Sequence, residues 1–434
     1  MNLFAVSYYA PPQLTPQAIQ IGRLLYHLDA KVTLLYGREA RFNDGYDQYP
    51  DFFDRIGALE VRDPGPFVTG LPLRLWRRLA PIYGNIPDGF GRWRRKAVRP
   101  ALGALQGRQY DALASFGMPM SGHLLAYQLK RRTGLPWLVH FSDPWTRNPF
   151  HRQGPVAAPI NAWMEKRVIA ASDQVLFTSQ RTLALVMDKY PADWRAKAAV
   201  LPHAWDMEHF AGPVPPEEPR SQAVRHVIRH IGNCYGTRSP LPLFEALALL
   251  EQRNPRLLDG VCFDFVGYVR ASALATPVFQ ALRPGLVRVR GQVGYRASLE
   301  SMRSASALLV IDAPSDHPSV FLPSKLIEYI GARRPVWGIT PPGTSADLIG
   351  EWAGTDSACA SPDDVAAIAR MLETGLRALD GAVDGAPVNA HTSAQEQVVQ
   401  RYCPTRVASE LRGHLVQAIA RCPAASAAAM SQGA

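Results

Sequence analysis

The sequence predicts an α/β protein built from two doubly wound, Rossmann-like domains of similar size. Short β-rich runs alternate with helical patterns along most of the chain, which is typical of βαβ units and a parallel sheet. A proline-dense stretch at residues 212–219 interrupts this alternation near the middle and is typical of a linker. A length of 434 residues is sufficient for two or three domains, each with its own core.

The first series of elements precedes the linker. Its predicted strands cover residues 3–8, 31–36, 112–115, 137–141, 174–177 and 199–201, and its predicted helices cover residues 18–28, 121–132 and 158–171. Residues 41–100 are rich in proline and aromatic residues and are predicted to be an irregular insertion. We therefore expect an amino-terminal domain over residues 1–210.

The second series follows a linker at residues 211–224. Its predicted strands cover residues 225–231, 261–266, 287–290, 307–311 and 335–339, and its predicted helices cover residues 240–252, 298–305 and 324–332. We expect a carboxyl-terminal domain over residues 225–400, a terminal helix over residues 401–420 that can pack back on the amino-terminal domain, and a flexible tail over residues 421–434. In such proteins, ligands usually bind between the domains, at the carboxyl ends of the strands.

The composition is basic. The chain has 47 Lys plus Arg against 37 Asp plus Glu, a formal charge of +10. Nucleic acid, an anionic membrane or a phosphorylated ligand would each fit this surplus. Five separated cysteines without a C-x-x-C pair indicate neither a zinc site nor a disulfide framework. The first residues lack a signal peptide pattern and no apolar run reaches about 18 residues, so we expect a cytoplasmic protein.

The most informative segment is residues 319–336, which follows a predicted buried strand and opens a helix. Pro323 and Ser324 suit the start of that helix, whose free N–H groups and positive dipole end favour an anion. Lys325 adds a mobile charge, and Glu328, one turn later, could accept hydrogen bonds from ribose hydroxyls. The alternative is a capped helix with an exposed Lys–Glu pair.

This segment resembles the carboxyl-domain motif of GT-B glycosyltransferases of family 4. Other pieces occur in the order that this family requires. Pro11-Pro12-Gln13-Leu14-Thr15 stands where the family has a loop before its first helix. Residues 134–145, 201–210 and 231–240 resemble, in turn, its strand ending in an Arg-Asp-x-Trp turn, the end of its amino domain and its donor-diphosphate loop. The resemblance spans about residues 3–345 and implies a retaining, metal-independent transferase.

The resemblance also implies roles for individual residues. The donor, a UDP- or GDP-type nucleotide sugar, would be bound by Gly232, Asn233, Arg238, Ser324, Lys325 and Glu328. Gln13, Leu14 and His140 would line the acceptor side of the cleft, in the amino-terminal domain. Asp143 and His123 would be catalytic. Asp143 could orient or deprotonate the acceptor hydroxyl, although an Asx-turn or helix cap before Pro144 is an equal alternative. A structural histidine is the alternative for His123.

The chain departs from the family pattern at three places. The family's paired glutamates are eight residues apart, and Val320 stands eight residues before Glu328. Gln13 and Leu14 replace a glycine pair in the first loop. His203 replaces an expected asparagine. These departures put the contacts to the transferred sugar in doubt but leave the phosphate-binding residues in place.

Several other enzyme classes lack their motifs. The Gly-x-Gly-x-x-Gly fingerprint is absent after the first strand, as are a phosphate-binding P-loop and a Gly-x-Ser-x-Gly elbow. No Asp-x-Asp motif is present, and Asp312 and Asp316 are interpreted as part of a solvated loop. We therefore expect neither a metal nor a cofactor.

Basic and aromatic residues concentrate between Leu71 and Pro100. Arginine interleaved with tryptophan suits an anionic membrane surface. A solvated surface helix is the alternative, and nucleic acid is disfavoured because no binding motif accompanies the residues. The predicted membrane patch consists of Arg74, Trp76, Arg77, Arg92, Trp93 and Arg94.

The sequence thus predicts a glycosyltransferase that uses a nucleotide sugar and acts on a glycan or lipid-linked acceptor in cell-surface polysaccharide assembly. The expected location is the inner face of the cell membrane, as a peripheral protein. Two alternatives remain open: a nucleotide-sugar epimerase or phosphorylase on the same fold, and a non-catalytic GT-B scaffold subunit.

Overall fold

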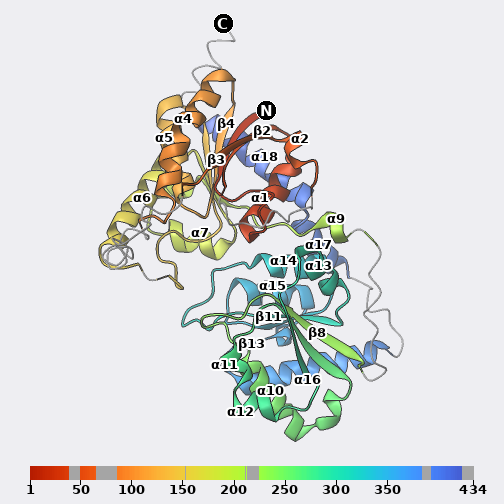
Figure 1. Cartoon of the computed structure of the whole chain (residues 1–434). Helices are drawn as coiled ribbons and strands as arrows, with labels where there is room; N and C mark the ends of the chain where they lie inside the picture. The colour runs from red at the N-terminus through yellow and green to blue at the C-terminus, as the bar shows by residue number, and fades with distance from the viewer. Residues whose placement is uncertain are drawn as a thin grey trace. The chain divides into compact units, whose positions relative to one another are not determined.

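The computed structural model describes residues 1–38, 49–64, 86–151, 153–210, 212, 224–383 and 392–422. The chain forms two compact units (Figure 1). The first contains residues 1–203 together with residues from 404 onward, and the second contains residues 204–403. Each unit is described separately below.

The first boundary lies before the predicted linker. Residues 204–210, expected in the amino-terminal domain, belong to the second unit because they are bonded within it. The backbone N–H of Trp205 donates to Tyr402 O, its indole N–H donates to Val399 O, and the N–H of Asp206 donates to Glu328.

The first unit contains a seven-stranded parallel sheet in the order β3-β2-β1-β4-β5-β6-β7. The strands are β1 (Asn2–Ser7), β2 (Lys31–Arg38), β3 (Gly57–Arg62), β4 (Ala112–Gly117), β5 (Trp137–Phe141), β6 (Gln174–Phe177) and β7 (Ala198–Val200). β1 pairs with β2 on one side and with β4 on the other, with Leu3 opposite Val32 and Ala112. The central strands β1, β4 and β5 are buried almost throughout, which explains their continuous apolar sequences.

The helices of the first unit are α1 (Pro16–Tyr26), α2 (Phe52–Arg55), α4 (Gly91–Gly107), α5 (Ser121–Thr133), α6 (Ala157–Ala171), α7 (Gln180–Met187), α8 (Ala192–Arg195) and α18 (Pro404–Arg421). Thr15 caps α1 by accepting from the N–H of Ala18. The carboxyl-terminal helix α18, blue in Figure 1, packs on α1 and on β5 and β6.

The predicted irregular insertion at residues 41–100 is only partly irregular. It contains the edge strand β3 and the first part of α4. β3 has one buried residue, Val61, so the sequence lacks the apolar pattern that identifies a strand. The helices and strands that were predicted are present, with ends shifted by a few residues. Helices α7, α15 (Thr344–Ala353) and α16 (Val365–Val383) and strand β13 (Cys359–Ala360) were not predicted.

The second unit contains a six-stranded sheet in the order β10-β9-β8-β11-β12-β13, again with parallel pairing. The strands are β8 (His226–Ile231), β9 (Val261–Val266), β10 (Val287–Gly291), β11 (Ala307–Ile311), β12 (Val336–Ile339) and β13 (Cys359–Ala360). The helices are α9 (Met207–Phe210), α10 (Leu241–Arg253), α11 (Ala271–Leu274), α12 (Pro277–Ala281), α13 (Tyr295–Arg303), α14 (Ser324–Gly331), α15 (Thr344–Ala353), α16 (Val365–Val383) and α17 (Ser393–Arg401), with short 3-10 turns at Pro255–Leu258 and Asp356–Ala358.

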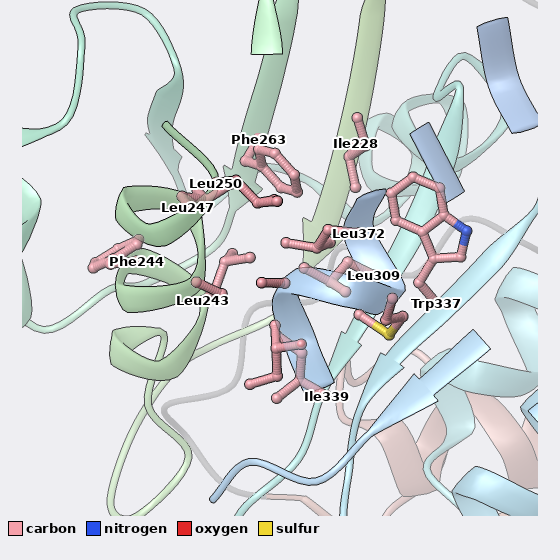
Figure 2. Close-up of a cluster of buried hydrophobic side chains, with 14 of the residues drawn as sticks. Ile228, Leu243, Phe244, Leu247, Leu250, Phe263, Leu309, Trp337, Ile339 and Leu372 are labelled. Carbon is pink, nitrogen blue, oxygen red and sulfur yellow. The ribbon is translucent and has the colours of Figure 1, made fainter. Parts of the chain in front are cut away.

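The core of the second unit fills the space between the sheet and helices α10 and α16. Figure 2 shows Leu243, Phe244 and Leu247 of α10 beside Phe263, Leu309 and Ile339 of the strands. This core fixes the sheet, so that the loops at the carboxyl ends of its strands are held in place. The predicted fold class, two doubly wound α/β domains, is confirmed at the level of the two separate units.

No helix in the described ranges combines the length and apolarity needed to cross a membrane.

Candidate functional site

A glycine contact shapes the loop that follows β8. Gly232 has φ +137° and Gly267, after β9, has φ +144°. A Cβ on Gly267 would overlap the carbonyl oxygen of Gly232, so the two loops touch through their backbones. The N–H of Gly232 donates to Val266 O at 2.9 Å. Both positions therefore require glycine, for backbone conformation and for close approach.

The predicted donor residue Asn233 helps to hold this loop. Its Oδ1 accepts a hydrogen bond from the N–H of Tyr268 at 2.8 Å. The side chain thus connects the β8 loop to the β9 loop. Its side-chain carbonyl is engaged within the protein, so a direct contact of Asn233 with a donor remains a prediction.

Lys325 lies in the first turn of α14, as the sequence predicted. The lysine as a whole is half-buried, but its Nζ atom is buried and has no hydrogen-bond partner among the described residues. Nζ would lie 3.7 Å from a Cβ on Gly232. Burial, and then the charge of Arg238, lower the pKa of the Lys325 ammonium from 10.5 to about 8. The alternative of an exposed Lys–Glu pair is therefore wrong.

The start of α14 is held by the chain around Gly343. The N–H of Ser319 donates to Pro342 O at 2.8 Å, and the N–H of Thr344 donates to Ser319 O at 2.9 Å. Pro323 is the N-cap residue and no side chain caps the helix, so the amides of its first turn, including that of Ser324, have no side-chain cap. The lysine and the helix dipole place positive charge at the same end of α14.

Arg238 adds a second positive charge to this cluster. Its Nη2 lies 3.5 Å from Oδ1 of Asp312, and its guanidinium lies 5.7 Å from the centre of the Tyr235 ring. Asp312 is buried at the end of β11 and accepts from the hydroxyl of Thr340 at 3.2 Å. The interpretation of Asp312 as part of a solvated loop is therefore wrong, whereas Asp316 is exposed. Asp312 is thus paired with Arg238 and not with Lys325, although its charge also favours the ammonium form of the lysine.

His230, a residue that the sequence analysis did not single out, lies beside Lys325. Its Nδ1 bonds to Leu309 O at 3.0 Å, which places the proton on Nδ1 because a carbonyl can only accept. Burial, followed by the charge of Lys325, holds the pKa of this imidazole well below 6.5. His230 is therefore neutral and adds no charge to the cluster. The sequence of β8, His-Val-Ile-Arg-His-Ile, contains no pattern that would have identified His230 as a site residue.

Glu328 is buried, with 5% of its surface exposed. Its Oε2 accepts from the N–H of Asp206 at 2.9 Å. The Asp206 carboxylate in turn accepts from the N–H of His209 at 3.0 Å and from the hydroxyl of Tyr295 at 3.0 Å. Glu328 thus fixes the segment that leads into α9, and its predicted contact with ribose hydroxyls remains a prediction.

In the first unit, Asp143 follows β5. Burial raises the pKa of its carboxyl from 3.8 to about 6. No described residue donates a hydrogen bond to it, so the structure gives no support to the Asx-turn or helix-cap alternative. A carboxyl group that has a raised pKa and forms no hydrogen bond with a described residue is suited to proton transfer.

His123 is buried in α5 and forms a relay with two strand residues. Its Nδ1 lies 2.9 Å from Ser115 Oγ, which also accepts from the indole N–H of Trp137 at 3.0 Å. Trp137 can only donate, so the serine hydroxyl can donate its own proton to Nδ1; with Ser115 as the donor, the imidazole proton lies on Nε2. Burial, and then the proximity of His140, lower the pKa of His123 to about 3. The ring is neutral.

The Nε2 atom of His123 lies beside Gly117, where the lack of a side chain leaves space for the imidazole ring. A Cβ on Gly117 would lie 2.5 Å from Nε2, and the Nε2 atom has no hydrogen-bond partner in the described part of the chain. The carbonyl oxygen of Gly117 accepts from Gln17 at 2.9 Å and from the Ser142 hydroxyl at 2.5 Å. The end of β4 is thus held in place around the imidazole.

The remaining predicted acceptor residues occupy different surroundings. The Nε2 of His140 donates to Leu201 O at 3.2 Å, and burial lowers the pKa of this imidazole to about 4. Gln13 is buried, and its amide donates to Gly37 O at 2.8 Å. Leu14 is half-buried. Gln13 therefore joins the first loop to the end of β2.

The predicted membrane patch is corrected at one residue. Trp93 is fully buried and packs edge-on against Tyr8, with ring centres 5.0 Å apart, so it cannot contact a membrane. Arg92 and Arg94 lie on the same helix, α4, and are half-buried. Arg74, Trp76 and Arg77 lie outside the described residues. Trp93, Ala97 and Ala101 are four residues apart, a spacing that marks the buried face of a helix.

Comparison with known proteins defines the family relationship. Residues 23–204 match the model of the glycosyl transferase 4-like domain. The match covers less than half of the chain and lies almost entirely within the first unit. This match agrees with the predicted resemblance to glycosyltransferase family 4 for residues 23–204. No curated protein sequence matches the chain.

Solved structures share the fold over nearly the whole of this chain. The lipopolysaccharide outer core galactosyltransferase WaaB is 13% identical, with a TM-score of 0.57, and the match covers 96% of this chain and 99% of that one. An α,α-trehalose-phosphate synthase (UDP-forming) from Burkholderia xenovorans, in complex with glucose-6-phosphate, is 13% identical, with a TM-score of 0.60 and coverage of 96% and 100%. A trehalose-6-phosphate structure from E. coli, bound with UDP-2-fluoro glucose, is 12% identical, with a TM-score of 0.58 and coverage of 96% and 99%.

Proposed function

We propose that this protein is a glycosyltransferase that moves a sugar from a nucleoside diphosphate sugar, of the UDP or GDP type, to an acceptor hydroxyl. The observation that carries the proposal is the buried, unpartnered ammonium of Lys325. A buried cation without a partner is costly, and a diphosphate would supply the missing negative charge. UDP-2-fluoro glucose in one structural neighbour is consistent with a ligand of this chemistry.

Arg238 and the first turn of α14 complete the proposed diphosphate site. Transfer places negative charge on the leaving diphosphate, so preformed positive charge at that position stabilises the transition state. Lys325 and Arg238 serve this purpose through their own charges, and we propose a metal-independent reaction. Among the described residues, no group of three or more His, Cys, Asp or Glu is placed to hold a metal ion. Retention of the anomeric configuration is part of the proposal, from the family resemblance.

In the first unit, we propose that Asp143 orients or deprotonates the acceptor hydroxyl, and that the Nε2–H of His123 donates to a hydroxyl of the bound sugar. The pKa of about 6 keeps Asp143 ionised at neutral pH, as a proton acceptor requires. The acceptor is proposed to be a glycan or lipid-linked glycan in cell-surface polysaccharide assembly. The proposed location is the cytoplasmic face of the cell membrane, as a peripheral protein.

A thermal-shift screen against UDP-, GDP- and dTDP-sugars tests the donor site, because a ligand that binds the native state raises its melting temperature. We expect one nucleotide class to stabilise the protein and Arg238→Ala to remove that effect. Arg253→Ala is the matched control, since Arg253 is exposed on α10 of the same unit. Equal stabilisation of both variants would contradict the site. A product assay without acceptor separates a transferase from an epimerase.

A further inference from the structure

Three neighbouring helices of the first unit are strongly basic. Helices α4, α5 and α6 carry ten basic side chains and one acid, Glu165, whereas the whole chain has a formal charge of +10. Figure 1 shows the three helices following one another along the unit, and α5 packs on both α4 and α6. The charge is therefore gathered on one part of the fold.

The single acid does not reduce this charge at the surface. Glu165 is fully buried, and its carboxylate accepts from the hydroxyls of Thr146 and Tyr190 at 2.8 and 2.7 Å. The ammonium of Lys189 lies 2.5 Å from its Oε1. The surface formed by the three helices thus presents cations without a competing carboxylate of their own.

A groove of about 660 Å³ lies among these helices. Its lining includes four arginines, two aromatic residues and no acid. Arg131 and Arg132 are exposed, and the guanidinium of Arg167 donates to the Tyr127 hydroxyl at 2.9 Å. We call this feature the arginine groove; its basic and aromatic lining residues are Arg94, Tyr127, Arg131, Arg132, Trp163 and Arg167. Its charge selects an anionic partner.

Helix α6 is unusual because apolar side chains lie on its solvent side. Val156, its N-cap residue, is 50% exposed and Trp163 is 55% exposed, while Asn161 and Glu165 are buried. Val156, Ile160 and Trp163 follow the spacing i, i+4, i+7, which places them on one face. Ile160 is half-buried, between the exposed Val156 and Trp163. An apolar face that is partly exposed beside a basic groove is typical of helices that lie in a membrane interface.

Trp163 and Arg167 connect the two features. The Arg167 guanidinium lies 4.5 Å from the centre of the Trp163 ring. Tryptophan has an apolar body and a polar edge, and arginine can lay its stem along apolar surface while its charge stays at the headgroups. Trp163 and Arg167 therefore suit the boundary between phosphate headgroups and acyl chains. Nucleic acid fits less well, because it would leave Val156 and Ile160 without apolar partners.

We infer that the arginine groove and the apolar face of α6 form a docking surface for an anionic lipid bilayer. Phosphate headgroups would occupy the groove, and Trp163 would insert at the level of the headgroups. The inference rests on the membrane location in the proposed function and identifies the surface responsible. In this docking surface, the tryptophan that contacts the membrane is Trp163 and not Trp93, which was predicted from the sequence but is buried.

Vesicle co-sedimentation of the full chain tests the inference. We expect binding to vesicles of phosphatidylcholine mixed with phosphatidylglycerol, little binding to phosphatidylcholine alone, and weakening by salt. The double variant Arg131→Glu/Arg132→Glu should bind at least about ten-fold more weakly, because each basic group near the headgroups contributes to affinity. Trp163→Ala should also weaken binding, and Trp163→Phe should retain more of it.

The matched control is Arg253→Glu/Arg256→Glu, which makes the same charge change at exposed positions of the second unit. Equal loss in this control, or unchanged binding of the Arg131/Arg132 variant, would overturn the inference. Binding to RNA without binding to anionic vesicles would also overturn it. The thermal shift with nucleotide sugars, measured on the same variants, tests the donor site independently. If vesicles bind but no nucleotide sugar raises the melting temperature, the result contradicts the proposed function and not the docking surface.

Discussion

Lys325 and Gly232 are in close contact at the carboxyl ends of the strands of the second unit: a Cβ on Gly232 would lie 3.7 Å from Lys325 Nζ. The glycine leaves room beside the ammonium, and no described residue forms a hydrogen bond with it. A buried charge thus lies beside a backbone position that carries no side chain. The cost of that charge in the free protein is the basis of the first two predictions.

Replacing Lys325 by methionine should stabilise the free protein while removing donor binding. Methionine keeps most of the stem and removes the buried, unpartnered ammonium. We expect the free energy of unfolding to rise by about 1–2 kcal/mol, or a few degrees in melting temperature. The stabilisation by nucleotide sugar should disappear. Calorimetry with and without donor measures both effects, and a variant that is destabilised yet binds donor normally would contradict the assigned role.

Donor affinity should depend on pH through Lys325. Its pKa in the free protein is about 8, lowered by burial, and a bound diphosphate would raise it because it favours the charged form. Affinity should therefore be nearly constant below pH 8 and fall as the pH rises above it, with one proton taken up on binding. Titration calorimetry in two buffers of different ionisation enthalpy measures this uptake.

Arg238 provides the control for that assignment. The charge of Arg238 lowers the pKa of Lys325. In Arg238→Ala, donor binding should be weaker, and the pH above which the affinity falls should be higher. In Lys325→Met, any residual affinity measured at high donor concentration should show no such pH dependence. A fall in affinity that still begins near pH 8 in the methionine variant would assign the titration to another group.

Gly267→Ala should unfold the donor loop locally and destabilise the protein. The added Cβ would overlap the carbonyl of Gly232, and φ +144° is unfavourable for alanine. We expect a loss of about 2–4 kcal/mol and weaker donor binding. Gly285→Ala is the matched control: φ is +84° there and no atom lies within 4 Å of the new Cβ, so only backbone strain, about 1 kcal/mol, is expected. Urea denaturation compares the two.

The sequence was sufficient to predict the parts of the fold and of the site that depend on residues close together in the chain. The strands of the central sheets are continuous apolar runs, and the start of α14 is marked by Pro323, Ser324 and Lys325 within three consecutive residues. β3 was missed because an edge strand with one buried residue carries little apolar signal. Trp93 was misassigned because neighbouring arginines outweighed the four-residue spacing of the buried face of its helix.

Other features depend on pairs that are distant in sequence. Glu328 and Asp206 are 122 residues apart, and Trp137 and Ser115 are 22 apart, yet each pair is joined by one hydrogen bond. No local pattern specifies such partners, because they meet only when β5 pairs with β4 or when residues 204–210 join the second unit. The orientation of His123 and the burial of Glu328 therefore follow from tertiary structure.

The relay from Trp137 through Ser115 to His123 predicts a defined tautomer. Long-range nitrogen–proton NMR spectra of the labelled protein should show His123 neutral and protonated on Nε2 across the physiological pH range, since its pKa is about 3. Ser115→Ala should remove the hydrogen bond to Nδ1 and leave the indole N–H of Trp137 unsatisfied, at a cost of about 1–3 kcal/mol. We expect turnover to fall more than donor affinity. Normal turnover together with a changed tautomer would show that the relay is structural only.

Asp143 should control the acidic side of the pH profile of transfer. Burial raises the pKa of its carboxyl to about 6, and the ionised form is the one proposed to act on the acceptor. Activity should therefore fall as the pH decreases through about 6 and be independent of Asp143 ionisation above it. Asp143→Asn should lower turnover by about 10²–10⁴-fold and abolish the acidic limb, which is the fall in activity as the pH decreases through about 6. Donor should still raise the melting temperature of this variant. An unchanged acidic limb in the asparagine variant would assign that ionisation to a different residue and leave Asp143 with a purely structural role.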